Sequence, residues 1–174
     1  FTVGNSIRSL SGYCSDVNNN TRIGTSAGED LTSGLNNTSL GAFAGRCTTT
    51  GCYNVAIGNN SLQLNTTGCQ NVAIGSSALC SNTTANFNTA VGGCSLYANT
   101  TGTCNTAIGA CALESNTTGS INTAIGHQTL TSNTTGRYNT AVGSWRALYC
   151  NTTGCSLVAV GHGAMCFNTT GDNN

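Results

Sequence analysis

A glycine recurs at a fixed interval through most of this chain, and this period constrains the fold more than any other feature. Each of these glycines closes a short apolar word such as NTAIG, which occupies residues 122–126. A strict short period that combines strand-like words with turn-like words predicts a solenoid of stacked coils. The evenly spaced glycines are Gly24, Gly41, Gly58, Gly75, Gly92, Gly109, Gly126 and Gly143, and the next is Gly161, one position later than the period predicts.

Stacking the repeats aligns residues of one kind into columns. A Thr/Val column precedes an Ile/Val column by two residues, and this alternation of β-branched residues predicts a strand. We expect the Thr/Val and Ile/Val side chains to fill the interior, the Ala between them to face outward, and a Leu column on a second strand to form the opposite wall. The Ile/Val column comprises Ile23, Leu40, Ile57, Ile74, Val91, Ile108, Ile125, Val142 and Val160. The Leu column comprises Leu62, Leu79, Leu96, Leu113, Leu130, Leu148 and Met165.

The expected fold is therefore all-β, a single-domain parallel β-solenoid of about ten 17-residue coils with two short strands in each coil. Stacked at the strand spacing of about 4.8 Å, ten coils form a rod about 48 Å long. Residues 1–174 make one domain, in which 1–23 form an irregular first coil, 24–171 carry the regular repeats and 172–174 begin a further coil. The extra residue after Gly143 predicts a bulge or a longer corner within Ser144–Cys150, at Trp145.

Composition argues against several classes of function. Only 6% of residues are charged and the net charge is zero, which gives no electrostatic footprint for nucleic acid or anionic lipid. No apolar run approaches the roughly 20 residues of a membrane helix, so we expect no membrane insertion. His127 and His162 each follow a strand-closing glycine, where we expect exposed turn residues, and the acidic residues are scattered. No catalytic set, cofactor or metal site is predicted, and we do not expect an enzyme.

The word Asn-Thr-Thr recurs in one column and suggests two different roles. Each copy is an Asn-x-Thr acceptor, so a secreted protein would carry a row of glycans along one edge of the rod. The alternative is a ladder in which the amides and hydroxyls hydrogen-bond from coil to coil. The glycosylation candidates are Asn65, Asn82, Asn99, Asn116, Asn133, Asn151 and Asn168.

Eleven cysteines in so small a chain indicate an oxidising compartment, and their odd number leaves at least one without an intrachain partner. Neighbouring coils bring cysteines of one column, or of nearly adjacent columns for Cys150 and Cys166, to a Cα separation that suits a disulfide. The alternative is a set of buried free thiols. The disulfide candidates are Cys52 with Cys69, Cys94 with Cys111, and Cys150 with Cys166.

The words NTAIG, NVAIG and NTAVG, each followed by Ala-Leu or Ser-Leu, resemble head repeats of YadA-like trimeric autotransporter adhesins. Similar repeats occur in phage and viral fibre proteins. The resemblance covers about residues 20–171, with Asn54, Ala56, Ile57 and Gly58 as one set of matching positions. It implies a left-handed parallel β-roll, exposure at a surface and a role in adhesion.

The two ends of the chain are complementary in sequence. The last four residues end where another coil would reach its Asn, and the first four supply the three strand residues and the closing Gly that would follow. Neither end shows a polar cap, which open solenoid ends normally need. A head-to-tail contact that does not close into a ring generates a filament. The predicted junction comprises Gly171, Asp172, Asn173 and Asn174 of one subunit, and Phe1, Thr2, Val3 and Gly4 of the next.

Two functions follow as expectations. The first is a structural subunit of an extracellular filament, on the surface of a cell or virion, whose partner is another copy of itself. The second is an adhesin head or a viral or phage fibre module that binds a host receptor or glycan. The irregular coils around Glu29-Asp30 and Trp145-Arg146 are the expected recognition surface in that second case.

Overall fold

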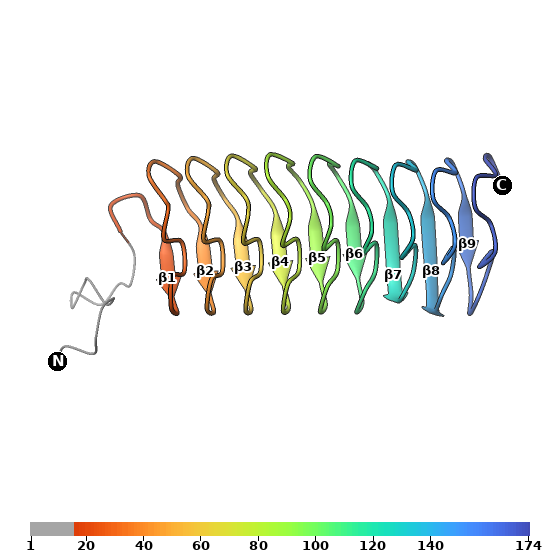
Figure 1. Ribbon diagram of the computed structural model, residues 1–174, viewed down its shortest axis with the longest axis horizontal. Helices are drawn as coiled ribbons and strands as arrows, with labels where there is room; N and C mark the ends of the chain where they lie inside the picture. The colour runs from red at the N-terminus through yellow and green to blue at the C-terminus, as the bar shows by residue number, and fades with distance from the viewer. Residues whose placement is uncertain (1–15) are drawn as a thin grey trace.

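The computed structural model describes residues 16–174 and shows a straight parallel β-solenoid of about eight turns (Figure 1). Each strand pairs in parallel with the strand of the next coil, so that one sheet runs along the rod in the order β1 to β9. The predicted all-β class and parallel solenoid are confirmed. The strands are β1 (Thr21–Ile23), β2 (Thr38–Leu40), β3 (Val55–Ile57), β4 (Val72–Ile74), β5 (Thr89–Val91), β6 (Thr106–Ile108), β7 (Thr123–His127), β8 (Thr140–Trp145) and β9 (Val158–Val160).

Each described coil contains one strand, so the prediction of two strands per coil is wrong. The Leu column lies in a tight turn, where Leu62 has a φ of 51° and Leu113 a φ of 53°. A left-handed backbone costs a non-glycine residue roughly 1–2 kcal/mol. Full burial of a Leu side chain, worth about 1.5–3 kcal/mol, offsets that cost. The second wall of the core is therefore a turn and not a strand.

The strand side chains point to the opposite sides of the sheet from those we expected. In β4 the central Ala73 is fully buried, Val72 is half-buried and Ile74 is 37% exposed. The alternation was predicted correctly, because residues two apart do share a face. The face was wrong: the interior admits only Ala between the sheet and the Leu wall, so the larger β-branched side chains lie outside.

The core is thin and built from three columns of small or Leu residues. The predicted Leu wall and the small-residue column beside it are both buried, and the strand alanines face them. The fully buried Leu residues of this wall are Leu62, Leu79, Leu96, Leu113, Leu130 and Leu148. The buried strand alanines are Ala56, Ala73, Ala90, Ala107, Ala124, Ala141 and Ala159.

Two buried amide ladders complete the interior. In the first, Asn82 Nδ2 donates to Asn65 Oδ1 at 2.8 Å and to the Ala85 carbonyl at 3.1 Å. In the second, the Asn71 backbone N–H donates to Asn54 Oδ1 at 3.0 Å. Buried polar groups need such partners, and the amides satisfy one another from coil to coil, from Asn65 to Asn168 in the first ladder and from Asn20 to Asn139 in the second. The ladder alternative for the Asn-Thr-Thr column is confirmed.

The two threonines of an Asn-Thr-Thr-Gly motif donate hydrogen bonds to a single carbonyl of the next coil. Thr83 O accepts from Thr66 N at 2.8 Å, from Thr67 N at 3.2 Å and from Thr66 Oγ1 at 3.1 Å. A Cβ on Gly68 would collide with the Ala85 carbonyl oxygen. Close approach of the coils therefore explains why this word recurs with little variation.

The extra residue in the coil after Gly143 produces the predicted bulge. Ile125 pairs with Val142, but His127 then pairs with Trp145, so one residue is inserted between the two pairs. Both strands are longer than the others, and the shift lies beyond the last pair of the Ile/Val column. The regular register is therefore kept on the rest of the sheet.

The two ends of the described solenoid differ. Arg22 stands in the inward column of β1, forms an ion pair with Asp16 at 3.4 Å and donates to the Gly28 carbonyl at 3.2 Å. Asp16 Oδ1 also accepts from Asn20 N at 3.0 Å. These bonds form a polar cap on the first described coil. Of the predicted junction, Phe1, Thr2, Val3 and Gly4 lie outside the described residues.

At the C-terminal end the coil begins to repeat in register. Val158 N donates to Asn174 O at 2.8 Å, the bond that Thr140 N makes to Leu157 O one coil earlier. Within the described residues no strand pairs with the far edge of β9, where Val158 is 62% and Val160 70% exposed.

Candidate interaction surfaces

The outer side of the sheet is an uncharged, largely apolar surface, which we call the outer sheet face. It consists of the Thr/Val and Ile/Val columns of the nine strands, which alternation places outside. Ile23 is 50% exposed, Leu40 42% and Ile108 40%. No charged residue occupies either column within the described residues. The Thr/Val column comprises Thr21, Thr38, Val55, Val72, Thr89, Thr106, Thr123, Thr140 and Val158.

The outer sheet face runs along all nine strands of the described solenoid. Nine strands at about 4.8 Å and two columns about 6.6 Å apart give a strip of roughly 290 Å². The largest apolar patch of a soluble chain typically covers a few hundred Å², and such patches often have a function. The strands pair without a register shift through the whole of both columns. The strip is therefore flat and continuous along the rod.

A further exposed column lies two residues before the Thr/Val column. Its members have left-handed backbone angles, yet several are large and apolar: Tyr53 and Tyr138 have φ of 57° and 60°, and Ile121 has φ of 59°. Tyr53, Phe87 and Tyr138 are 57–58% exposed. This column widens the apolar surface beside the outer sheet face. Its middle members are Tyr53, Gln70, Phe87, Cys104, Ile121 and Tyr138.

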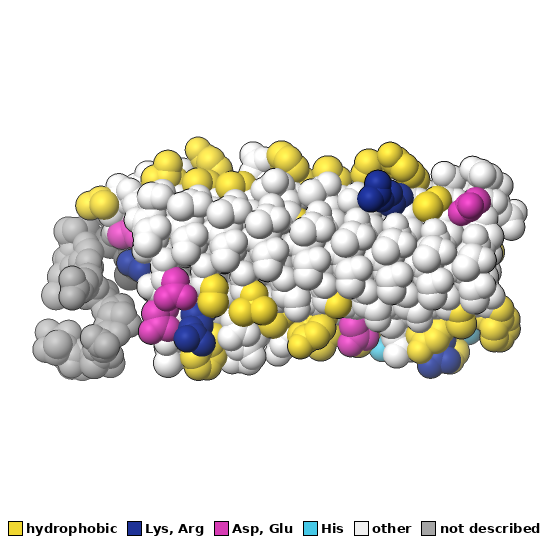
Figure 2. Space-filling view, turned by 45° about the horizontal axis from the view of Figure 1, so that its top comes forward, with side chains coloured by type: hydrophobic (Ala, Val, Ile, Leu, Met, Phe, Trp, Pro, Cys, Tyr) yellow, Lys and Arg dark blue, Asp and Glu magenta, His cyan; other side chains and the backbone are white. Residues whose placement is uncertain are grey.

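Charged side chains are confined to other parts of the surface. Figure 2 shows a broad band free of charged and apolar side chains, bordered by two rows in which both kinds occur. The irregular coil at Glu29 is one such place, where Glu29 pairs with Arg46 at 3.2 Å. The Arg46 guanidinium also lies 5.8 Å from the Phe43 ring centroid. In this part of the predicted recognition surface, Arg46 therefore neutralises the charge of Glu29.

The glycosylation candidates are placed inside the rod. Six of the seven asparagines are fully buried and Asn168, in the last coil, is half-buried. Asn116 Nδ2, for example, donates to Asn99 Oδ1 at 2.8 Å and to Gly119 O at 2.9 Å. A glycan attaches through this same nitrogen and needs space around it. Glycans on the six buried asparagines are therefore incompatible with the folded coils.

The cysteines are free thiols, and none of the three predicted disulfides is formed among the ten cysteines of residues 16–174. Neighbouring residues of a parallel in-register stack project side by side, about 4.8 Å apart. A disulfide needs a closer Cβ–Cβ approach of about 3.5–4.5 Å. Burial raises the pKa of the Cys80 and Cys111 thiols, with Cys94 a further cause for Cys80 and Glu114 for Cys111. These thiols therefore stay protonated at neutral pH.

Cys52, Cys69 and Cys155 have a structural role that the sequence did not reveal. Cys52 N donates to Cys69 Sγ at 3.1 Å, and Cys69 Sγ lies 3.4 Å from the Thr67 carbonyl, to which it donates. Other coils place an acceptor oxygen at this position, as Asn86 Oδ1 does for Cys69 N. The thiol thus replaces an amide or hydroxyl in a third side-chain ladder. These three cysteines occupy one column of the repeat once the extra residue at the bulge is counted. That shared column is the signal in the sequence by which they could have been grouped.

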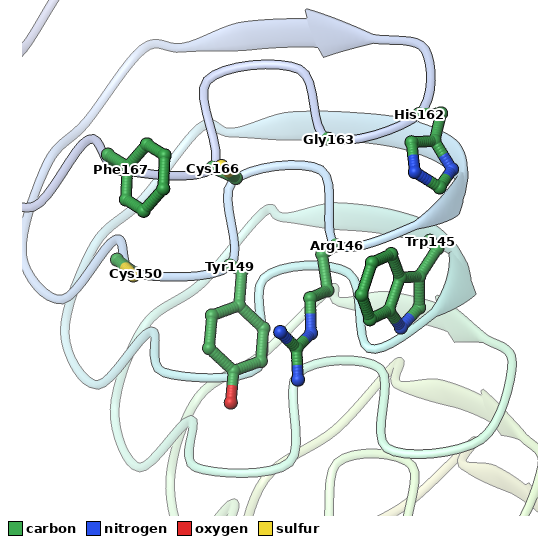
Figure 3. A pocket seen from close by; sticks show the side chains of 8 residues that line it. All are labelled: Trp145, Arg146, Tyr149, Cys150, His162, Gly163, Cys166 and Phe167. Carbon is green, nitrogen blue, oxygen red and sulfur yellow. The ribbon is translucent and has the colours of Figure 1, made fainter.

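The second surface surrounds the bulge and is called the aromatic corner. Its cavity of about 360 Å³ is lined by side chains of two successive coils (Figure 3). Arg146 Cζ lies 4.3 Å from the Trp145 ring and 4.5 Å from the Tyr149 ring, and its Nε donates to Gln128 Oε1 at 3.0 Å. The lining residues are Trp145, Arg146, Tyr149, Cys150, His162, Gly163, Cys166 and Phe167.

The two histidines are exposed, as predicted, but they do not meet. His127 ends β7, whereas His162 lies in the last coil, with its Nδ1 3.3 Å from Ser144 Oγ and its ring 5.5 Å from that of Trp145. Within residues 16–174 no group of three His, Cys, Asp or Glu side chains is arranged to hold a metal ion. The same residues contain no helix long and apolar enough to cross a membrane.

Comparisons with known proteins add no relative from which a role could be transferred. No family model matches this chain, and neither a curated protein nor a solved structure matches it. The surfaces described above are therefore the basis for any functional inference.

Proposed function

We propose that this chain is a structural rod of an extracellular fibre, in which the outer sheet face packs against other copies of the chain. The observation that carries the proposal is the flat, uncharged strip of Thr/Val and Ile/Val side chains along nine strands in register. Removing such a surface from water is worth roughly 25 cal/mol per Å². A partner with the same strip offers a matching shape and spacing.

The interior supports a structural role as well. Backbone bonds, two amide ladders and the threonine bonds repeat from coil to coil, so each coil stabilises its neighbours. Repeat arrays of this kind derive their stability from contacts between neighbours. The result is a rigid rod in which one side is free to associate. The resemblance to YadA-like heads favours a location at a cell or virion surface.

Growth along the rod axis is a further part of the proposal. The edge of β9 carries unpaired strand groups, and Asn174 already occupies the position that precedes each strand. A following strand, from a further coil or from Phe1–Gly4 of another subunit, would extend the sheet. The Arg22–Asp16 cap makes the N-terminal end of the described solenoid the less suitable of the two ends for stacking.

The test is the state of association of the purified chain. We expect light scattering and sedimentation to show oligomers at micromolar concentration, and electron microscopy to show bundled or extended rods. Ile108→Lys places a charge in the centre of the outer sheet face and should shift the chain to monomers. Thr101→Lys, at an exposed position of the Asn-Thr-Thr-Gly turn, is the matched control and should leave association unchanged. A wild-type chain that stays monomeric at tens of micromolar contradicts the proposal.

The adhesin reading has one specific observation in its favour. The described coil that contains the inserted residue also carries the aromatic corner, which breaks an otherwise uniform surface with rings and a cation. A receptor or glycan would find here a feature absent from the other described coils. A glycan array probed with the wild-type chain tests this second function.

A further inference from the structure

We propose that Cys94 and Cys111 together bind one copper(I) ion, held in a line between their two sulfur atoms. The two residues occupy the same column of successive coils, in the turns that follow strands β5 and β6. This column lies outside the outer sheet face, so the inference is independent of the fibre role. It assigns a ligand to two thiols that the sequence had suggested as a disulfide.

The two coils place the two thiols in the same way. Cys94 and Cys111 both have a left-handed φ of 56°. Cys94 N donates to Ser76 O at 3.0 Å, and Cys111 N makes the same bond to Gly93 O one coil later. The strands that precede them pair without a register shift, and both side chains are half-buried, so that solvent reaches them. The thiols therefore project side by side, about 4.8 Å apart.

This spacing is too wide for a disulfide but suits a metal ion with two ligands. A metal–thiolate bond is about 2.3 Å long, so an ion midway between two sulfurs in a line holds them about 4.6 Å apart. That separation is close to the spacing of the coils. Copper(I) prefers soft thiolate ligands and accepts two of them in a line. The regular stacking of the solenoid thus presets the distance that the ion requires.

Binding exchanges two protons for one copper ion. Each thiol loses its proton to solvent and each sulfur forms one bond to copper, so the neutral pair becomes a singly negative complex without a change of oxidation state. Burial raises the pKa of the Cys111 thiol, and the nearby Glu114 carboxylate raises it further. The same carboxylate opposes the negative complex. Glu114→Gln should therefore strengthen copper binding, and a lower pH should weaken it.

A second stacked pair of cysteines provides the contrast. Cys52 N donates to Cys69 Sγ at 3.1 Å, so a backbone N–H occupies the space beside the sulfur that a metal ion would need. Both thiols also donate to carbonyls of their own coils, at 3.3 Å for Cys52 and 3.4 Å for Cys69. Among the described residues, the sulfurs that accept from a backbone N–H are those of Cys52, Cys69 and Cys155. Cys94 and Cys111 stand outside this ladder, so their sulfurs can turn to a metal.

A further thiol lies near Cys94 but belongs to another column. Cys80 is buried, and its thiol donates to Gln63 Oε1 at 3.5 Å. Burial raises the pKa of Cys80, and the neighbouring Cys94 raises it further. Over residues 16–174 no group of three His, Cys, Asp or Glu side chains could hold a metal ion. The expected complex therefore contains two sulfurs.

The test is titration of the reduced, purified chain with copper(I) in competition with the chelator bathocuproine disulfonate. We expect the chain to retain one copper ion against the chelator. X-ray absorption should show two sulfur ligands at about 2.2–2.3 Å from copper. A wild-type chain that retains no copper, or an ion bound by three sulfurs, contradicts the proposal.

Three variants locate the site. Cys94→Ser should abolish retention without unfolding the coil, because Ser77 occupies the same column with a φ of 57°. Cys52→Ser, in the other stacked pair, is the matched control and should retain copper as the wild type does. Cys111→Ser combined with Ser77→Cys moves the pair by one coil and should bind copper again, because the coil spacing sets the site. The proposal is overturned if Cys94→Ser retains as much copper as Cys52→Ser, or if the moved pair retains none.

Discussion

The coils from β2 to β7 and the coils of β8 and β9 share one architecture but differ in how strictly they keep the repeat. In the first region every strand pairs at the same interval, and the core repeats Leu, Ala and Asn. In the second an inserted residue shifts the register at Trp145, and Leu157 replaces an Asn of the second ladder. The second region also holds the aromatic corner.

The comparison shows which contacts define the repeat. The first amide ladder and the threonine bonds continue across the longer coil: Asn151 Nδ2 donates to Asn133 Oδ1 at 2.9 Å, and Thr134 Oγ1 donates to Thr152 O at 3.1 Å. The insertion is absorbed at the end of the strand, where neighbouring coils are joined by few side-chain bonds. The interior ladders therefore fix the period, while the corner after the strand is free to acquire new features.

The largest expected effect is the loss of an amide in the middle of the regular region. Asn116→Ala removes two bonds donated by Nδ2 and leaves Asn133 Nδ2 without the Asn116 oxygen it now reaches at 2.9 Å. We expect a loss of about 4 kcal/mol in the free energy of unfolding, because buried groups are left unsatisfied. Denaturant unfolding followed by circular dichroism measures it.

Asn168→Ala is the matched change in the last coil. Asn168 is half-buried and ends the ladder, donating to Asn151 Oδ1 at 2.9 Å. Water can replace this partner, so the cost should be about 1 kcal/mol. Equal losses of unfolding free energy at the two positions would show that the amide ladder is not what stabilises the regular region.

The next effect compares the two ends of the Leu wall. Leu113 is fully buried, and Leu113→Ala should cost about 3 kcal/mol through lost burial and a cavity. Met165 occupies the same column in the last coil but is only partly buried, so Met165→Ala should cost about 1 kcal/mol. The same unfolding measurement applies. A larger loss at Met165 than at Leu113 would contradict a core centred on the regular coils.

A smaller effect is expected from removing the insertion itself. Deleting Ser144 should restore the regular interval between β7 and β8 at a change in stability within about 1 kcal/mol, because the ladders already bridge the longer coil. Ser144 makes a single side-chain contact, to His162 at 3.3 Å. Unfolding of the deletion variant measures this tolerance. A deletion that unfolds the chain would show that the bulge is part of the scaffold.

Much of the architecture could be predicted from the sequence, because residue types that turns and strands require recur at a fixed interval. The turn word, the Leu column and the bulge after Gly143 all follow from spacing and residue type. The direction of the strand side chains could not be predicted, because alternation identifies which residues share a face but not which face is inside. The narrow interior decides that question, and only the contact between Ala73 and the Leu wall reveals it.

The candidate sites were less predictable than the fold, for a related reason. Asn116 looks like a glycan acceptor and Cys52 like half of a disulfide when each is considered as an isolated motif. In the stacked chain their side chains serve the neighbouring coil. The outer sheet face was missed because its residues had been placed inside. Trp145 and Arg146 were singled out only because they follow a break in the period.

The smallest expected effect concerns the N-terminal cap, which differs from both regions. Burial alone would raise the pKa of Asp16, but hydrogen bonds from Asn20 and Asn18, with the charge of Arg22, hold it below its ordinary value of 3.8. The ionised carboxyl therefore stabilises the folded cap at neutral pH, and this contribution is lost as the pH falls below that value and through the lowered pKa. We expect the amides of the first coil to exchange faster at roughly pH 2.5 than at pH 5, after correction for intrinsic rates, while amides near β5 keep their protection. Asp16→Asn should remove this pH dependence, and equal protection of the wild-type Asn18 and Asn20 amides at both pH values would show that the cap does not depend on the Asp16 charge.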